Sequence, residues 1–216
     1  MSQGTKKKSH RGAWITSGVI VVLLVAMGTL GTKVINENDV AAATASGLDP
    51  QTFVTESYDD VIVGGITERA EDVVTVAEAL QADPAQAAKD FAVGSGPTAT
   101  YSVKFTGIAG ELAPSGYLPI TVEGMPEGVG VSVQTGPALL GTALRDATGK
   151  ATFEMFTNQL DFQGVGDKLN AQMKTELLDK LDIKSLSGQE ITVVGAFQPL
   201  NPKLLLVMPV SIEVAK

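Results

Sequence analysis

The stretch Thr100-Tyr101-Ser102-Val103-Lys104-Phe105 begins the region from which the fold class can be predicted, because apolar and polar side chains alternate along it. A period of two residues is typical of a β-strand with one buried face. Two further stretches, residues 117–123 and 130–134, have similar composition and are bounded by glycine and proline. We therefore predict three successive strands in this region.

An amphipathic helix follows the three predicted strands, over residues 158–181. Its apolar side chains recur every three or four residues, at Phe162, Val165, Leu169, Met173, Leu177 and Leu181. Gly164 and Gly166 weaken the first half of this helix by about 1 kcal/mol each relative to alanine.

Two more strands are predicted after the helix, over residues 190–197 and 203–214. Pro209 lies inside the second of them and indicates an edge position or a bulge, because proline lacks the N–H that a sheet ladder needs. The order is thus three strands, one helix and two strands. This is the order of the OB fold, a five-stranded, partly open barrel in which the helix closes one end. A two-layer sheet with one helix across its face fits the same pattern, and either architecture belongs to the α+β class.

Three short helices are predicted upstream of the strands, over residues 48–93. Asp49-Pro50 starts the first, which ends at Gly64-Gly65; the second covers residues 67–82, and Asp83-Pro84 starts the third. This helical subdomain is too small to bury much apolar surface alone, so we expect it to pack on the rest of the chain. Gly94-Ser95-Gly96-Pro97 separates it from the barrel domain of residues 94–216.

The N-terminal region differs from the rest in charge. Of the 16 basic residues, five lie within residues 1–33, where there is no acidic residue. The following 183 residues contain 11 basic and 24 acidic residues, a net charge of −13. Between the basic tail (residues 1–12) and this acidic body, residues 13–30 form an uncharged run.

The uncharged run predicts a transmembrane signal anchor. As a helix, its 18 residues would span roughly 27 Å, close to the thickness of the hydrocarbon core. The basic tail then lies in the cytoplasm, and the body is extracytoplasmic, joined by a spacer at residues 31–47. Two alternatives are a cleavable signal peptide, with small residues at Ala26-Met27-Gly28, and a buried soluble helix.

Composition excludes several kinds of chemistry. The chain has no cysteine, so it has no disulfide, thiolate metal site or cysteine nucleophile. Its one histidine, His10, lies in the basic tail, which argues against a Ser-His-Asp triad and a multi-histidine metal site. We predict no cofactor and no metal. The acidic body argues against nucleic-acid binding, although many OB folds bind nucleic acid.

Four motifs resemble a bacterial family of predicted periplasmic lipoproteins, domain of unknown function 2291. They are Gly141-Thr142-Ala143-Leu144-Arg145-Asp146-Ala147, Phe156-Thr157-Asn158-Gln159, Leu169-Asn170 and Val194-Gly195-Ala196-Phe197. The resemblance implies export, a helical subdomain followed by an OB-like barrel, and occurrence beside sugar-type ABC transporter components. It implies no activity.

The chain departs from this family at its lipid attachment point. Relatives place a lipid-modified cysteine just before the Lys33-Val34-Ile35 start, whereas this chain has Gly31-Thr32 there. A lipid anchor on cysteine is therefore impossible. Attachment to the membrane then depends on residues 13–30.

Six polar residues in the motifs are candidates for a binding site: Thr142, Arg145, Asp146, Asn158, Gln159 and Asn170. Arg145 could present a bidentate guanidinium to a carboxylate or a sugar, with the neutral side chains adding hydrogen bonds. The alternative is that Arg145 and Asp146 form an internal ion pair that holds a loop on the helix. The asparagines and the glutamine could equally cap a helix or satisfy buried carbonyls.

Two functions of different classes follow. The first is a non-catalytic, membrane-anchored envelope protein that binds a solute or a protein partner, as an accessory to a sugar-type ABC transporter. The second is a cofactor-free carbohydrate-active enzyme that uses carboxylates, for which Asp59-Asp60, Glu71-Asp72 and Asp161 with Asp167 are available pairs.

Overall fold

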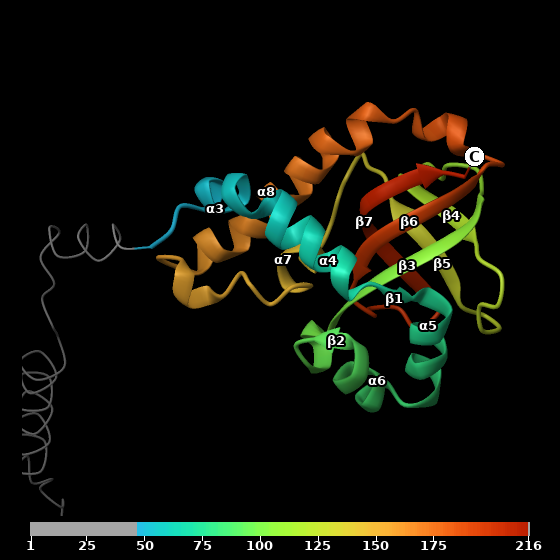
Figure 1. Ribbon diagram of the computed structural model, residues 1–216, viewed down its shortest axis with the longest axis horizontal. Coiled ribbons are helices and arrows are strands. Elements are labelled where there is room, and N and C mark those ends of the chain that lie inside the picture. The colour runs from blue at the N-terminus through green and yellow to red at the C-terminus, as the bar shows by residue number, and fades with distance from the viewer. Residues whose placement is uncertain (1–46, 216) are drawn as a thin grey trace, which may run out of the picture. The chain divides into compact units, whose positions relative to one another are not determined.

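A closed five-stranded barrel forms the centre of the computed structural model, which describes residues 47–215 (Figure 1). Its strands are β3 (Thr100–Ala109), β4 (Tyr117–Thr121), β5 (Gly130–Gln134), β6 (Glu190–Phe197) and β7 (Leu204–Val214). The spatial order is β3-β4-β5-β7-β6, and β6 returns to pair with β3. The β5–β7 pair is parallel and the others are antiparallel. This closure confirms the predicted OB-like barrel and excludes the alternative, a two-layer sheet with one helix across its face.

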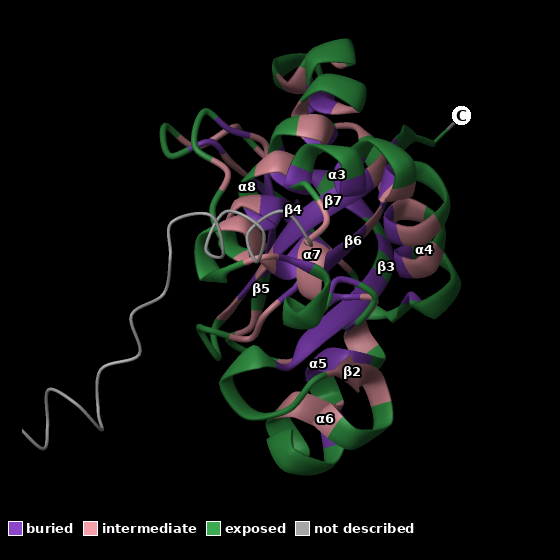
Figure 2. Ribbon diagram, turned by 90° about the vertical axis from the view of Figure 1, so that its left-hand side faces the viewer, coloured by how far each residue is buried: buried purple, intermediate pink, exposed green. Residues whose placement is uncertain are grey.

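Beyond Val103, the alternation along β3 produces the expected two faces, whereas the polar side chains of Thr100 and Ser102 before it are buried as well. Val103, Phe105 and Ala109 are buried, whereas Lys104 and Thr106 are exposed. Side chains from all five strands meet in one hydrophobic core, and buried side chains from the helices around the barrel also belong to it. Figure 2 shows this buried interior enclosed by helices with exposed outer faces.

Pro209 lies at a β-bulge, one of the two positions expected for it. Val194 pairs with Ser211, but Gly195 pairs with Pro209, so β7 carries one extra residue here. β5 pairs only with residues 204–207 of β7. No β5 carbonyl therefore faces Pro209, and the N–H that proline lacks is not needed on that side.

The first predicted helix begins as expected but extends further. The Asp49 side chain accepts a hydrogen bond from the Thr52 N–H at 2.9 Å, and Pro50 is the first helical residue. α3 (Pro50–Ser57) continues through a π-helical segment (Tyr58–Val63) into α4 (Gly64–Arg69). The prediction that Gly64-Gly65 ends the helix was therefore wrong. A Cβ on Gly65 would lie 2.9 Å from the Thr148 Cγ2, so glycine here permits a close approach of that loop.

The second predicted helix starts later than expected, so the start at residue 67 was wrong. Ala70 is extended, and β1 (Glu71–Asp72) pairs in parallel with β3. Asp72 then caps α5 (Val73–Ala82), because its Oδ1 accepts hydrogen bonds from the Val74 and Thr75 amides. β4 pairs with β3 only at Ile108 and Ala109, which leaves one side of β3 free at Val103 and Lys104. Glu71 and Asp72 pair there instead of joining the helix, and the local sequence pattern does not indicate this pairing.

The third predicted helix and the long helix follow in the predicted order, whereas a short helix over residues 143–146 was not predicted. Asp83 caps α6 (Pro84–Phe91), after which β2 (Ala92–Val93) pairs with the start of β3. α7 (Ala143–Asp146) and α8 (Gln159–Glu176) lie between the third and fourth barrel strands. The helix predicted over residues 158–181 ends at Glu176, and a 3₁₀ turn at Leu178–Lys180 follows. α3 packs against α8, and α4 against β3 and β6, so the helices cover the barrel as expected.

The described residues, 47–215, all belong to one compact unit. Among them, we find no helix with the length and hydrophobicity of a membrane span. The predicted basic tail, the signal anchor at residues 13–30 and the spacer up to residue 46 lie outside the described residues.

Candidate functional site

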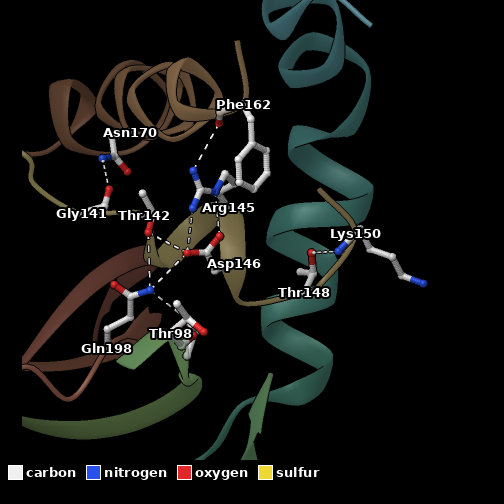
Figure 3. Close-up of polar contacts among 11 residues, drawn as sticks. Thr98, Gly141, Thr142, Arg145, Asp146, Thr148, Lys150, Phe162, Asn170 and Gln198 are labelled. Atoms are coloured by element: carbon white, nitrogen blue, oxygen red, sulfur yellow. Dashed lines mark hydrogen bonds and ion pairs between the residues drawn. The ribbon is translucent and has the colours of Figure 1, made fainter. Parts of the chain in front are cut away.

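Arg145 and Asp146 form a bidentate ion pair on the short helix α7 (Figure 3). The Arg145 Nε donates to the Asp146 Oδ1 at 2.7 Å, and Nη2 donates to Oδ2 at 3.2 Å. Their side chains are only 11% and 18% exposed. A desolvated, bidentate pair is stronger and more directional than an ion pair on the open surface.

Phe162 of α8 also contacts the Arg145 guanidinium, through both its carbonyl and its ring. The Arg145 Nη1 donates to the Phe162 carbonyl at 3.3 Å, and the Arg145 Cζ lies 4.0 Å from the centroid of the Phe162 ring. This hydrogen bond and cation–π contact join α7 to the first half of α8.

The Asp146 carboxylate also accepts hydrogen bonds from a side chain directly before α7 and from one directly after β6. Thr142 donates its hydroxyl to Oδ2 at 2.6 Å, and the Gln198 amide donates to the same oxygen at 3.2 Å. Gln198 also donates to the Thr100 hydroxyl at 3.2 Å. The Arg145 cluster, defined as Thr142, Arg145, Asp146, Phe162 and Gln198, therefore connects α7 and α8 to the ends of β3 and β6.

The other predicted site residues have local structural contacts. Asn170 is 3% exposed, and its Nδ2 donates to the Gly141 carbonyl at 3.0 Å, which secures the loop before α7. Asn158 caps α8 by accepting hydrogen bonds from the Leu160 and Asp161 amides. Gln159 is exposed in the first turn of α8.

The structure thus brings Thr142, Arg145 and Asp146 together and joins Asn170 to the same loop. Asn158 and Gln159 do not take part in the Arg145 cluster. The contacts of Arg145 match the geometry of an internal ion pair, the alternative raised from the sequence. A ligand-binding role for these six residues stays a prediction.

An apolar cleft lies between the α5–α6 hairpin and the loop that joins β6 to β7. It consists of two adjoining hollows of about 600 Å³ and about 310 Å³, which share Leu80, Pro84 and Pro199. Ala85, Ala88 and Ala99 add to the apolar wall of the larger hollow, and Val129, Pro202 and Leu205 to that of the smaller. Figure 1 shows the α5–α6 hairpin beside one end of the barrel.

Polar side chains enter the larger hollow at three positions: Lys89, Ser95 and Tyr101. Tyr101 is 1% exposed, and its ring stacks on Phe197 with centroids 5.4 Å apart. Burial raises the pKa of the Tyr101 hydroxyl, so this group stays protonated and able to donate a hydrogen bond at neutral pH.

A polar cleft of about 550 Å³ lies elsewhere on the surface, where the π-helical segment and α4 approach the loop after α7. Asp60, Glu68, Arg69, Thr148 and Lys150 line it. Across residues 47–215, no group of three or more acidic or histidine side chains is arranged to hold a metal ion.

Four residues of these sites were missed from the sequence. Gln198 and Phe162 become part of the Arg145 cluster only when β6 and α8 meet α7. Lys89 and Tyr101 are 12 positions apart and share a hollow only because β2 brings the end of α6 back to β3. Gln198 directly follows the Val194–Phe197 motif, and this adjacency is the one signal that could have identified it.

The topology and the helix between strands three and four define an OB-fold protein with an additional helical layer. A crystal structure of an OB-fold protein from Thermotoga maritima is similar, with a TM-score of 0.63 at 21% identity. The match covers 78% of this chain and 99% of that one, and at this identity it shows the fold alone. A search of curated proteins found no significant match.

The chain belongs to the predicted periplasmic lipoprotein family DUF2291, whose model matches residues 19–213. Membership confirms the resemblance drawn from the four motifs and supports a location in the cell envelope. The family is of unknown function, so neither catalysis nor a transport role follows from membership.

Proposed function

We propose that this chain is a non-catalytic binding protein of the cell envelope, held at the membrane by residues 13–30, with the apolar cleft as its ligand site. The observation that carries the proposal is the pair of adjoining hollows lined mainly by apolar side chains. Their volumes fall in the range of small-molecule sites, which are typically concave, mostly apolar and supplied with a few polar groups.

The position of the apolar cleft supports this role. Pro199, Asn201 and Pro202 belong to the loop between the last two barrel strands, one of the loops with which OB folds bind ligands. Two prolines limit the backbone freedom of this loop, and Gln198 at its start is held by Asp146 and Thr100. A wall that is ordered before binding loses less conformational entropy when a ligand enters.

We propose a sugar-type ABC transporter as the partner of this binding protein, on the basis of the family resemblance. The apolar lining argues against a sugar as the ligand of the cleft, because each unpaired sugar hydroxyl would cost free energy on burial. Co-purification of transporter subunits with the full-length chain from native membranes tests the association separately from the ligand.

The enzyme alternative depends on carboxylates that face one space. Asp60 and Glu68 both line the polar cleft, which makes them the pair to examine for carbohydrate hydrolysis. Product release from cell-wall glycans that D60N and E68Q each abolish would favour the enzyme and contradict a purely binding function.

We expect A88W to lower ligand capture in the apolar cleft about tenfold, because the indole would fill space that a ligand needs. The probe is a neutral alkyl alcohol with a photoreactive diazirine, added to the full-length chain in phosphatidylcholine vesicles. Mass spectrometry of cross-linked peptides measures labelling of Leu80, Val129 and Leu205, which line the hollows.

A82W is the matched control, because Ala82 is exposed on α5 and lines neither hollow. It should leave labelling unchanged. Equal labelling of A88W and the unmodified chain, or labelling spread evenly over the surface, would contradict the proposed site.

A further inference from the structure

We propose that the apolar cleft selects a single-chain amphiphile with a carboxylate head group, such as a long-chain fatty acid. This inference rests on the proposed function and adds the chemical class of the ligand. The head group would lie at Lys89 and Tyr101 in the larger hollow, and the alkyl chain would pass Leu80 and Pro84 into the smaller one.

The charge of the lining points to an anionic ligand. Within the described part of the chain, Lys89 is the one charged side chain that lines either hollow, and no carboxylate does. Lys89 forms no ion pair or hydrogen bond with any residue of the 47–215 region through its ammonium group. In a body with a net charge of −13, an unpaired cation beside an apolar cleft is available to a ligand anion.

The Tyr101 hydroxyl is the second, independent observation. Its residue is 99% buried and lines the larger hollow, yet the hydroxyl has no hydrogen-bond partner among residues 47–215. Asn170 Oδ1 is the one fully buried side-chain oxygen or nitrogen without a partner among the described residues, so the Tyr101 hydroxyl oxygen keeps some accessible surface and can donate to a ligand oxygen in the hollow. One oxygen of a carboxylate can face Lys89 while the other accepts from Tyr101.

The apolar walls identify the rest of the ligand. The lining that the two hollows share, Leu80, Pro84 and Pro199, provides no hydrogen-bonding side chain between them. An alkyl chain fits this passage because it brings no polar group that would lose its hydrogen bonds there, and Gln81 and Asn201 are the polar residues of the smaller hollow. A carboxylate has one negative charge and matches the one cation, whereas a phosphate monoester would bring up to two.

The test uses saturated fatty acids with a diazirine at the tail end, added to the full-length chain in phosphatidylcholine vesicles. We expect cross-links at Val129 and Leu205, in the smaller hollow. Apparent affinity should rise about fourfold for each added methylene until the cleft is full, since burying one methylene stabilises binding by about 0.8 kcal/mol. The matching fatty alcohol should bind at least fivefold more weakly.

Two conservative variants separate the head-group contacts from folding. Y101F keeps the ring stacked on Phe197 and should weaken fatty-acid binding about tenfold, because it removes a hydrogen bond to a charged group. K89Q should weaken it about fivefold, a smaller loss because Lys89 is exposed. Both variants should weaken alcohol binding less than fatty-acid binding, because a hydrogen bond to a neutral hydroxyl is weaker than one to a carboxylate. K184Q removes an exposed lysine outside the cleft and is the control.

The outcomes distinguish this inference from the function on which it rests. If the alcohol and the acid label the cleft equally and K89Q affects neither, head-group selection is wrong while the apolar ligand site stands. If tail-end probes label Lys89 instead of Val129 and Leu205, the proposed orientation is wrong. If no probe labels the cleft, both this inference and the proposed ligand site fail.

Discussion

Replacement of Arg145 by alanine is expected to lower the free energy of unfolding by about 2–4 kcal/mol. The change removes two charge-assisted hydrogen bonds to Asp146, one to the Phe162 carbonyl and the cation–π contact. It also leaves the Asp146 carboxylate, which is 18% exposed, without its cation. Breaking a fully buried pair by removing one partner costs about 3–5 kcal/mol, and the residual exposure of this pair lowers that figure.

Urea denaturation of the full-length chain and its variants measures this effect. A double-mutant cycle with D146A and R145A/D146A isolates the pair, and we expect a coupling energy of about 1–3 kcal/mol. R145K should recover only part of the loss, since an ammonium group cannot reproduce the bidentate geometry. If R145A is as stable as the unmodified chain but loses ligand binding, Arg145 is a binding residue and its structural role is refuted.

Replacement of Gly195 by alanine is the second large effect, and we expect a loss of about 3 kcal/mol or more. Gly195 lies in β6 opposite Pro209, at the bulge. A Cβ there would lie 2.4 Å from the Met208 carbonyl oxygen and 2.7 Å from the Val207 Cγ1. The carbonyl belongs to the backbone of β7, so relief requires the strands to separate, which costs more than ordinary overpacking of about 1–3 kcal/mol.

Gly164→Ala is the matched control for this substitution. Gly164 lies within α8, and a Cβ there would meet no atom within 4 Å. We expect it to stabilise the protein by about 0.5–1 kcal/mol, because alanine favours the helix interior. Urea midpoints that move in the same direction for both variants would contradict the steric role of Gly195.

The barrel could be predicted from sequence because each strand carries its own evidence. Alternation along residues 100–105 identifies a strand without reference to any other element, although the burial of Thr100 and Ser102 shows that it does not assign every side chain to a face. Asp49 and Asp83 likewise mark helix starts through contacts within one turn. Signals of this kind depend on neighbours in the chain, so they can be read from one sequence.

The helix boundaries near Gly64 and Ala70 could not be predicted, because distant residues decide them. Glycine usually marks a helix end, but here Gly65 lies within a helix at the point where Thr148 approaches. Glu71 and Asp72 leave the helix because β3 offers a free edge.

Site residues were likewise predicted where their contacts are local in sequence and missed where they are not. Arg145 and Asp146 were identified because they are adjacent in a motif, and Thr142 lies one helical turn before Asp146. Gln198 was missed, since it reaches Asp146 only after β6 has paired with β3. The apolar cleft was missed for the same reason, as its walls come from α5, α6 and the β6–β7 loop.

Composition and local patterns were enough to predict the order of the five barrel strands, the charge contrast between the tail and the body, the absence of cysteine chemistry and the family. These properties follow from composition and from contacts between near neighbours. The internal pairing of Arg145 and the hollow that Lys89 and Tyr101 share become visible only in the folded chain. Such contacts join residues that are distant in the chain, and their geometry exists only once the closed barrel holds β3 and β6 side by side.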